Sequence, residues 1–206
     1  MCSSDLALLN YSEMPETLKL WHAIIRNGLP QKQDGRIFFF DLSDISGHCA
    51  QSIEDVMTGI QSFRPYGRTF LSVNENEFAR LITNLCGNNP EAAFADRESV
   101  ALLKQHIPVD VLIARTLSSF YAVDENGRIS EVQNRYAKDP KVLTGTGDNQ
   151  NAGICAALLC DMPMEQVLQA GVCCGWYYMT KGHCVPNWNT LSEQLNSSQD
   201  CPSESH

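Results

Sequence analysis

Short apolar segments alternate with segments of helical period along residues 5–116. Apolar runs typical of buried strands occupy 5–10, 36–42, 68–73 and 109–116. Helix-period segments lie between them, at 16–27, 52–63, 75–87 and 97–106. Alternation of this kind predicts an α/β fold in which helices cover both faces of a mostly parallel sheet, giving three layers, α/β/α.

The pattern changes in the last third of the chain. Residues 118–133 are typical of two strands joined across Asn126-Gly127, a dipeptide that favours tight hairpins. Two helices are predicted after the hairpin. The first belongs to the stretch "LTGTGDNQNAGICAALL" at 143–159, and the second spans about 164–178.

Length and composition are ordinary for a globular protein. The chain has 206 residues, of which 43% are hydrophobic and 19% charged, enough for one domain with a sizeable core. The polar residues from Leu191 onward predict a frayed, disordered tail. We therefore expect a partial α/β domain over 1–190 and a tail over 191–206.

Charge and cysteine content limit the partners and the compartment. The formal net charge of −9 argues against a nucleic-acid partner, because phosphate backbones attract basic surfaces. No apolar stretch is long enough for a membrane span, and the N-terminus lacks the features of a signal peptide. Nine cysteines without a C-x-x-C spacing favour free thiols in a reducing cytoplasm. His183 beside Cys184, and Cys201 near His206, lack the further ligands that a zinc site requires.

Polar residues follow the predicted strands directly. Ligands of parallel α/β sheets lie outside the carboxyl ends of the strands. By this rule, the candidate ligand-binding residues are those of the loop before Asp148 and those that follow each strand. The latter are Asp41, Asp44, Asn74 through Glu77, Arg115 and Thr116.

The stretch at 143–159 combines glycines with a carboxylate at the start of a helix. Gly145 and Gly147 allow the backbone to approach a ligand, and the first N–H groups of a helix attract anions. Gly145, Thr146 and Gly147 thus suit a phosphate, and Asp148 suits a base that takes a proton from an attacking hydroxyl. The simpler alternative is that these residues only cap the N-terminus of the helix.

Asn74 and Glu77, in "SVNENEFARL", allow two interpretations. They follow the third strand and are able to organise magnesium and nucleotide phosphates. Taken alone, they are better explained as a capping box, in which Asn74 caps the helix and Glu77 bonds back to it.

These stretches together resemble the ribokinase-like (PfkB) carbohydrate kinase family. "TGTGDNQNAGICAALL" is similar to its Gly-x-Gly-Asp signature, and "NENE" is similar to its Asn-x-x-Glu motif. "FFFDLSD" and "MTKGHCVP" resemble segments that flank these motifs. Order and spacing agree over about residues 5–188, which correspond to the C-terminal, catalytic and nucleotide-binding part of the family.

The resemblance implies a function and a role for each matched residue. It implies a kinase that transfers the γ-phosphate of ATP, with Mg²⁺, to a hydroxyl of a small-molecule sugar. Asp148 would be the catalytic base, and Gly145, Thr146 and Gly147 the anion hole. Asn74 and Glu77 would organise magnesium and phosphates, Glu77 through water. The nucleotide would lie between a loop near Arg115 and Thr116 and the last helices.

The sequence also departs from the family pattern. Val142 and Leu143 replace the Asp-Thr linked with a monovalent cation, and Gly171 replaces a frequent asparagine. "ARTLSSF" lacks the glycine turn expected under the nucleotide, and Arg115 fits a surface arginine better than a phosphate ligand. The N-terminal sugar-binding segment and β lid have no counterpart.

These departures keep other functions open. A module that binds nucleotide or a partner without efficient turnover is the main alternative to a kinase. A cysteine-based redox or metal protein is a weaker one.

Overall fold

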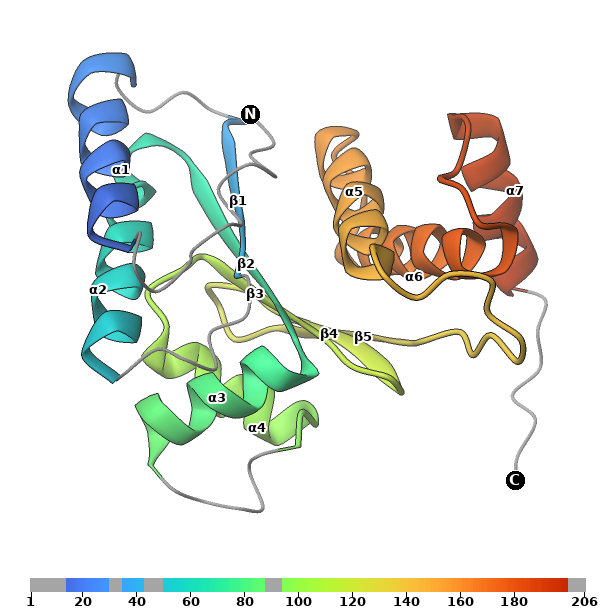
Figure 1. Cartoon of the computed structure of the whole chain (residues 1–206), viewed down its shortest axis with the longest axis horizontal. Helices are drawn as coiled ribbons and strands as arrows, with labels where there is room; N and C mark the ends of the chain where they lie inside the picture. The colour runs from blue at the N-terminus through green and yellow to red at the C-terminus, as the bar shows by residue number, and fades with distance from the viewer. Residues whose placement is uncertain (1–13, 30–34, 43–49, 88–93, 200–206) are drawn as a thin grey trace. The chain divides into compact units, whose positions relative to one another are not determined.

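The computed structural model describes residues 14–29, 35–42, 50–87 and 94–199 (Figure 1). The chain divides into two compact units. Unit 1 comprises Met1–Thr116 and Tyr121–Ser130, and unit 2 comprises Leu117–Phe120 and Glu131–His206. The partial α/β domain expected over 1–190 stays a prediction.

Helices and strands alternate in the first unit as the sequence predicted. Its elements before the hairpin are α1 (Met14–Gly28), β1 (Ile37–Asp41), α2 (Ala50–Gln61), the 3-10 turn η3 (Arg64–Tyr66), β2 (Arg68–Asn74), α3 (Glu75–Cys86), α4 (Arg97–His106) and β3 (Val111–Arg115). The hairpin strands β4 (Ser119–Val123) and β5 (Ile129–Gln133) follow. The second unit contains α5 (Thr146–Leu159), α6 (Met164–Lys181) and α7 (Trp188–Gln199).

The five strands form one mixed sheet in the order β1-β2-β3-β4-β5. β1 pairs with β2, and β2 with β3, in parallel. Parallel neighbours need a crossover connection, which α2 supplies between β1 and β2, and α3 and α4 between β2 and β3. The predicted α/β class is confirmed.

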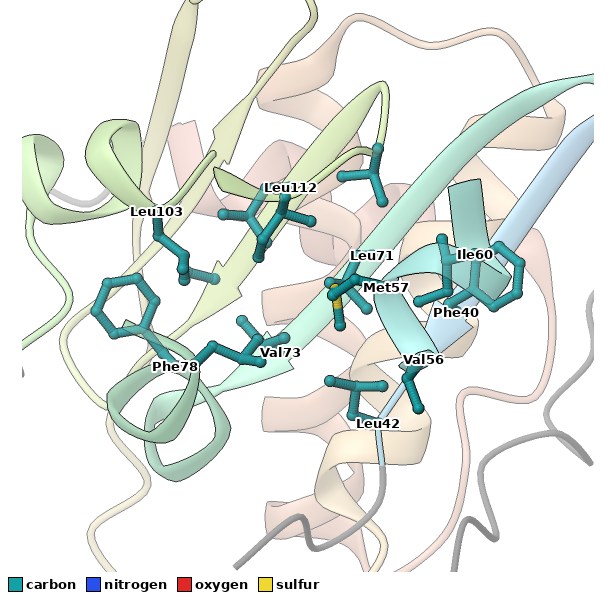
Figure 2. Packing of buried hydrophobic residues seen from close by; sticks show 14 of the residues in the cluster. Phe40, Leu42, Val56, Met57, Ile60, Leu71, Val73, Phe78, Leu103 and Leu112 are labelled. Atoms are coloured by element: carbon teal, nitrogen blue, oxygen red, sulfur yellow. The ribbon is translucent and has the colours of Figure 1, made fainter. Parts of the chain in front are cut away.

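One face of the parallel strands forms the core of unit 1. Phe40, Leu71 and Leu112 lie side by side in the strand register, so their side chains share a face. Figure 2 shows them beside side chains of α2, α3 and α4. The fully or almost fully buried helical residues of this cluster include Ile60, Phe78, Leu81, Ile82 and Leu103.

Aromatic rings join α1 to the sheet. Trp21 makes edge-to-face contacts with Phe40 and Phe63, with ring centroids 5.3 and 5.8 Å apart. Gly59 of α2 lets the two helices approach. A Cβ atom at this position would lie 2.6 Å from Cδ2 of Leu18 and 2.9 Å from the Trp21 ring. The helix contact therefore requires glycine here.

Two sequence predictions concern the ends of the chain. The strand predicted at 5–10 lies outside the described residues. The tail predicted from Leu191 is wrong for residues 191–199, because α7 extends from Trp188 to Gln199. Leu191 is buried, and Arg135 donates to the backbone oxygen of Gln194 at 3.3 Å, so the helix has tertiary support. Among the described residues, no helix has the length and apolar character needed to cross a membrane.

We expect Gly59→Ala to destabilise the protein. Alanine favours a helix interior over glycine by about 1 kcal/mol. Overpacking against the Trp21 ring costs about 1–3 kcal/mol, so the packing term should dominate. Urea unfolding followed by tryptophan fluorescence measures the difference.

Gly28→Ala is the matched control, because no atom lies within 4 Å of the Cβ that it would add. This variant should be neutral or slightly stabilising. Equal effects at both positions would contradict the proposed contact between α1 and α2.

Candidate functional site

The carboxyl ends of β1, β2 and β3 carry polar residues on one face of the sheet. Asp41 is in register with Ser72, and Asn74 with Arg115. Because alternate residues of a strand share a face, Asp41, Asn74 and Arg115 start from the same side. The structure therefore brings these three residues of unit 1 together at the carboxyl ends of the strands, where ligands of parallel α/β sheets bind. Asp44 lies outside the described residues.

Asn74 and Glu77 form a complete capping box at the start of α3. The Asn74 side chain accepts a hydrogen bond from the Glu77 N–H at 3.0 Å. In return, the two carboxylate oxygens of Glu77 accept from the Asn74 backbone N–H at 2.9 Å and from its side-chain amide at 2.7 Å. The capping interpretation is confirmed. It leaves Glu77 buried and fixed, and Asn74 exposed at the end of β2.

Arg115 is not the surface residue that the sequence suggested. Its side chain is only 4% exposed, and it donates to a carboxylate oxygen of Asp41 at 2.9 Å. The Asp41 side chain is 21% exposed. Burial of a guanidinium is tolerated where a carboxylate compensates its charge. The interpretation of Arg115 as a surface arginine is therefore wrong, and the following Thr116 is buried as well.

We expect Asp41→Asn to cost about 3 kcal/mol of stability, because it removes the compensating charge from a buried arginine. Chemical denaturation measures the loss. Glu125→Gln is the control, since Glu125 and Arg68 form an ion pair in which both side chains are more than 40% exposed. Breaking an exposed pair should cost at most about 1 kcal/mol. Similar losses in both variants would show that the Asp41–Arg115 pair is not effectively buried.

The start of α5 has the geometry of a sharp turn into a helix. Gly145 is the N-cap residue and adopts the left-handed conformation, with φ 88°. Asn149 donates to the Gly145 carbonyl oxygen twice, from its backbone N–H at 3.1 Å and from its side-chain amide at 2.9 Å. The turn is thus held from inside the helix, and glycine is the residue that it favours.

Thr146 also braces the turn. Its backbone N–H and its hydroxyl both donate to the Leu143 carbonyl oxygen, at 3.2 and 2.7 Å. One of the donors expected in the anion hole is therefore used inside the loop in this structure. Asp148 lies in the first turn of α5 with an exposed side chain. Partial positive charge of the helix N-terminus stabilises a carboxylate at that place.

Glycines bring α5 and α6 into close contact. A Cβ on Gly153 would lie 2.5 Å from the Ala170 carbonyl oxygen, and one on Gly175 would lie 2.5 Å from the Gln150 side chain. A Cβ on Gly171 would lie 2.7 Å from Cγ1 of Ile154. The absence of the expected asparagine at Gly171 thus has a packing reason, since no side chain fits there.

Sequence reasoning missed two contacts, one in each unit. The first is the Asp41–Arg115 pair, which joins residues of two strands that are not adjacent in the sheet. The second is Tyr178 of α6, whose hydroxyl donates to the Thr144 carbonyl oxygen at 3.1 Å. The sequence shows only an aromatic run, Trp176 to Tyr178, and no local pattern marks this contact.

The six cysteines within the described part of the chain are free thiols. Among the residues that the structure describes, no cluster of three or more His, Cys, Asp or Glu side chains could hold a metal ion. Burial raises the pKa of the Cys174 thiol to about 12, with smaller contributions from Cys173 and Cys184. A thiol of this kind is protonated at neutral pH and packs as a small apolar group.

Comparison with known proteins finds similarity at the level of structure. No family model and no curated protein matches the chain. The nucleoside kinase of Methanocaldococcus jannaschii, an archaeal member of the ribokinase family, has a TM-score of 0.62 and 17% identity, covering 89% of this chain and 53% of its own. Ribokinase from Thermotoga maritima has a TM-score of 0.61 and 14% identity, covering 95% and 62%.

Adenosine kinase from Anopheles gambiae, solved with P1,P4-di(adenosine-5) tetraphosphate, has a TM-score of 0.57 and 15% identity, covering 87% of this chain and 48% of its own. This chain spans about half to three fifths of the length of these three proteins. Similarity at such identities shows the fold, and it confirms the resemblance read from the sequence at that level. The chain therefore has the ribokinase-like α/β fold, in a partial form.

Proposed function

We propose that the chain is the catalytic part of a kinase that transfers the γ-phosphate of ATP to a hydroxyl group of a carbohydrate. The observation that carries the proposal is the start of α5. There a left-handed Gly145 leads into a helix N-terminus, and the exposed carboxylate of Asp148 lies in the first turn. The fold is shared with kinases, and one of these was solved with a bound adenosine polyphosphate.

In this proposal, Asp148 is the general base that accepts the proton of the attacking sugar hydroxyl. Its exposure supports the role, because a base must reach its substrate. Gly145, Thr146 and Gly147 surround the transferred phosphate with backbone N–H groups at the positive end of the helix. In this structure the Thr146 N–H donates to the Leu143 carbonyl oxygen, so a phosphate would compete with that hydrogen bond.

Asn74 and Glu77 are the proposed magnesium-associated residues. Carboxylate and amide oxygens suit Mg²⁺, which would neutralise charge on the phosphates. Both Glu77 oxygens already accept from Asn74, so contact through a water molecule fits better than direct coordination. Arg115 and Thr116 remain proposed for the nucleotide loop. The buried ion pair of Arg115 supports an indirect role, in which it fixes the strand end from which that loop continues.

The main alternative is a module that binds nucleotide with little or no turnover. The observation in its favour is the start of α5, where the backbone N–H and the hydroxyl of Thr146 both donate to the Leu143 carbonyl oxygen. A proposed donor of the anion hole is thus used inside the loop, which weakens the stabilisation of a transferred phosphate.

Asp148→Asn tests the catalytic assignment. We expect it to reduce sugar phosphorylation at least about a hundredfold, the lower end of what a general base contributes. Binding of ATP with magnesium, measured by calorimetry, should stay within about threefold of the wild type, because Asn keeps the shape of the side chain. Asp161→Asn is the control, since Asp161 is an exposed carboxylate in the turn after α5.

A panel of sugars and nucleosides separates the two functions. Phosphorylation by the wild type that Asp148→Asn abolishes supports the kinase. Nucleotide binding by the wild type without any turnover supports the binding module. Near-normal turnover by Asp148→Asn contradicts the role of Asp148.

A further inference from the structure

The loop that leads into α5 is attached to the last turns of α6. The Tyr178 hydroxyl donates to the Thr144 carbonyl oxygen at 3.1 Å. The Lys141 N–H donates to the Met179 carbonyl oxygen at 2.8 Å. Two successive residues of α6 thus hold the segment from Lys141 to Thr144, immediately before the left-handed Gly145.

The Tyr178 contact fixes the orientation of one peptide group. A trans peptide is planar, and its C=O and N–H point in opposite directions. The Thr144 carbonyl oxygen is directed at Tyr178, so the Gly145 N–H in the same peptide is directed away from that hydroxyl. Rotation of this peptide would turn the N–H toward α6.

The next peptide is held by other groups. The Gly145 carbonyl oxygen accepts twice from Asn149, and the Thr146 N–H donates to Leu143. These contacts come from the loop and from α5 itself. Tyr178 is therefore a side chain of α6 that donates a hydrogen bond to the loop before α5, and it acts on the peptide between Thr144 and Gly145.

The packing around Gly145 makes the contact specific. A Cβ added to Gly145 would lie 3.1 Å from the Tyr178 hydroxyl oxygen and 3.5 Å from Cζ of the ring. The end of the tyrosine thus occupies the space beside the glycine. Close contact between α5 and α6, through Gly153 and Gly171, keeps the two helices at the separation that this arrangement requires.

We propose that Tyr178 is a positioning residue for phosphate binding, which fixes the Thr144–Gly145 peptide so that the Gly145 N–H faces a phosphoryl group at the start of α5. The inference rests on the proposed function, since it concerns the same phosphate site. Tyr178 lies outside the Gly145–Gly147 stretch, and the donor that it orients is the Gly145 N–H.

Tyr178→Phe tests the proposal, because it removes the hydroxyl and keeps the ring. Tyr177→Phe is the matched control: it removes one hydroxyl from the neighbouring residue, whose ring contacts His183. The ¹⁵N relaxation of the Gly145 amide, measured by NMR, reports how rigidly the Thr144–Gly145 peptide is held without any ligand. Calorimetry with magnesium tripolyphosphate, and separately with adenosine, reports the affinity for phosphate and for the nucleoside.

In Tyr178→Phe we expect the NMR order parameter of the Gly145 amide to fall. The dissociation constant for tripolyphosphate should rise by about three- to tenfold, the factor that one hydrogen bond is worth. Affinity for adenosine and the thermal midpoint should stay near the wild-type values. Tyr177→Phe should match the wild type in every measurement.

The outcomes separate this inference from the proposed function. If the wild type binds tripolyphosphate and Tyr178→Phe binds it equally well, the positioning role is wrong while the phosphate site stands. A wild type that binds neither tripolyphosphate nor ATP contradicts the proposed function, and with it the role of Tyr178 at a phosphate. Equal weakening for tripolyphosphate and adenosine would indicate a general structural effect and would also overturn the inference.

Discussion

Parallel pairing of β1, β2 and β3 is the constraint on which the first unit depends. It places all three carboxyl ends at one edge, so polar residues that are distant in the sequence meet there. It also requires crossover helices, and their apolar sides bury Phe40, Leu71 and Leu112 in one core (Figure 2). The polar residues at these strand ends have partners of their own. The Asp41–Arg115 pair compensates one buried cation, and the capping box fixes Glu77 at the start of α3.

The second unit depends on the close approach of two helices, α5 and α6. Gly153 lets α5 approach the backbone of α6, and Gly171 and Gly175 of α6 leave room for the side chains of Ile154 and Gln150. That contact places Tyr178 against the loop before α5, where Gly145 makes the turn. The loop before α5 is thus held by Tyr178 of α6 and by Asn149 of α5 itself. A phosphate site requires such support, because backbone donors stabilise developing charge only when they are oriented beforehand.

Local signals explain what the sequence predicted well. Helix α4 matches its expected bounds because Asp96 caps it and its apolar spacing is regular, and Gly145 to Asp148 form the expected turn into a helix. Contacts between distant residues explain the rest. Asp41 and Arg115 are 74 positions apart, so no local pattern reports their pairing. Helix α7 is polar in sequence, and its order comes from the burial of Leu191 and the contact of Arg135 with Gln194.

A phosphate site at the start of α5 makes a direct prediction for NMR of the ¹⁵N-labelled chain titrated with ATP and magnesium, because each backbone amide reports its own surroundings. The amide signals of Gly145, Thr146, Gly147 and Asp148 should shift with one common dissociation constant, and adenosine alone should leave them in place. Saturable ATP binding that leaves these four signals unmoved, or no ATP binding at all, would contradict a nucleotide phosphate site at this helix start.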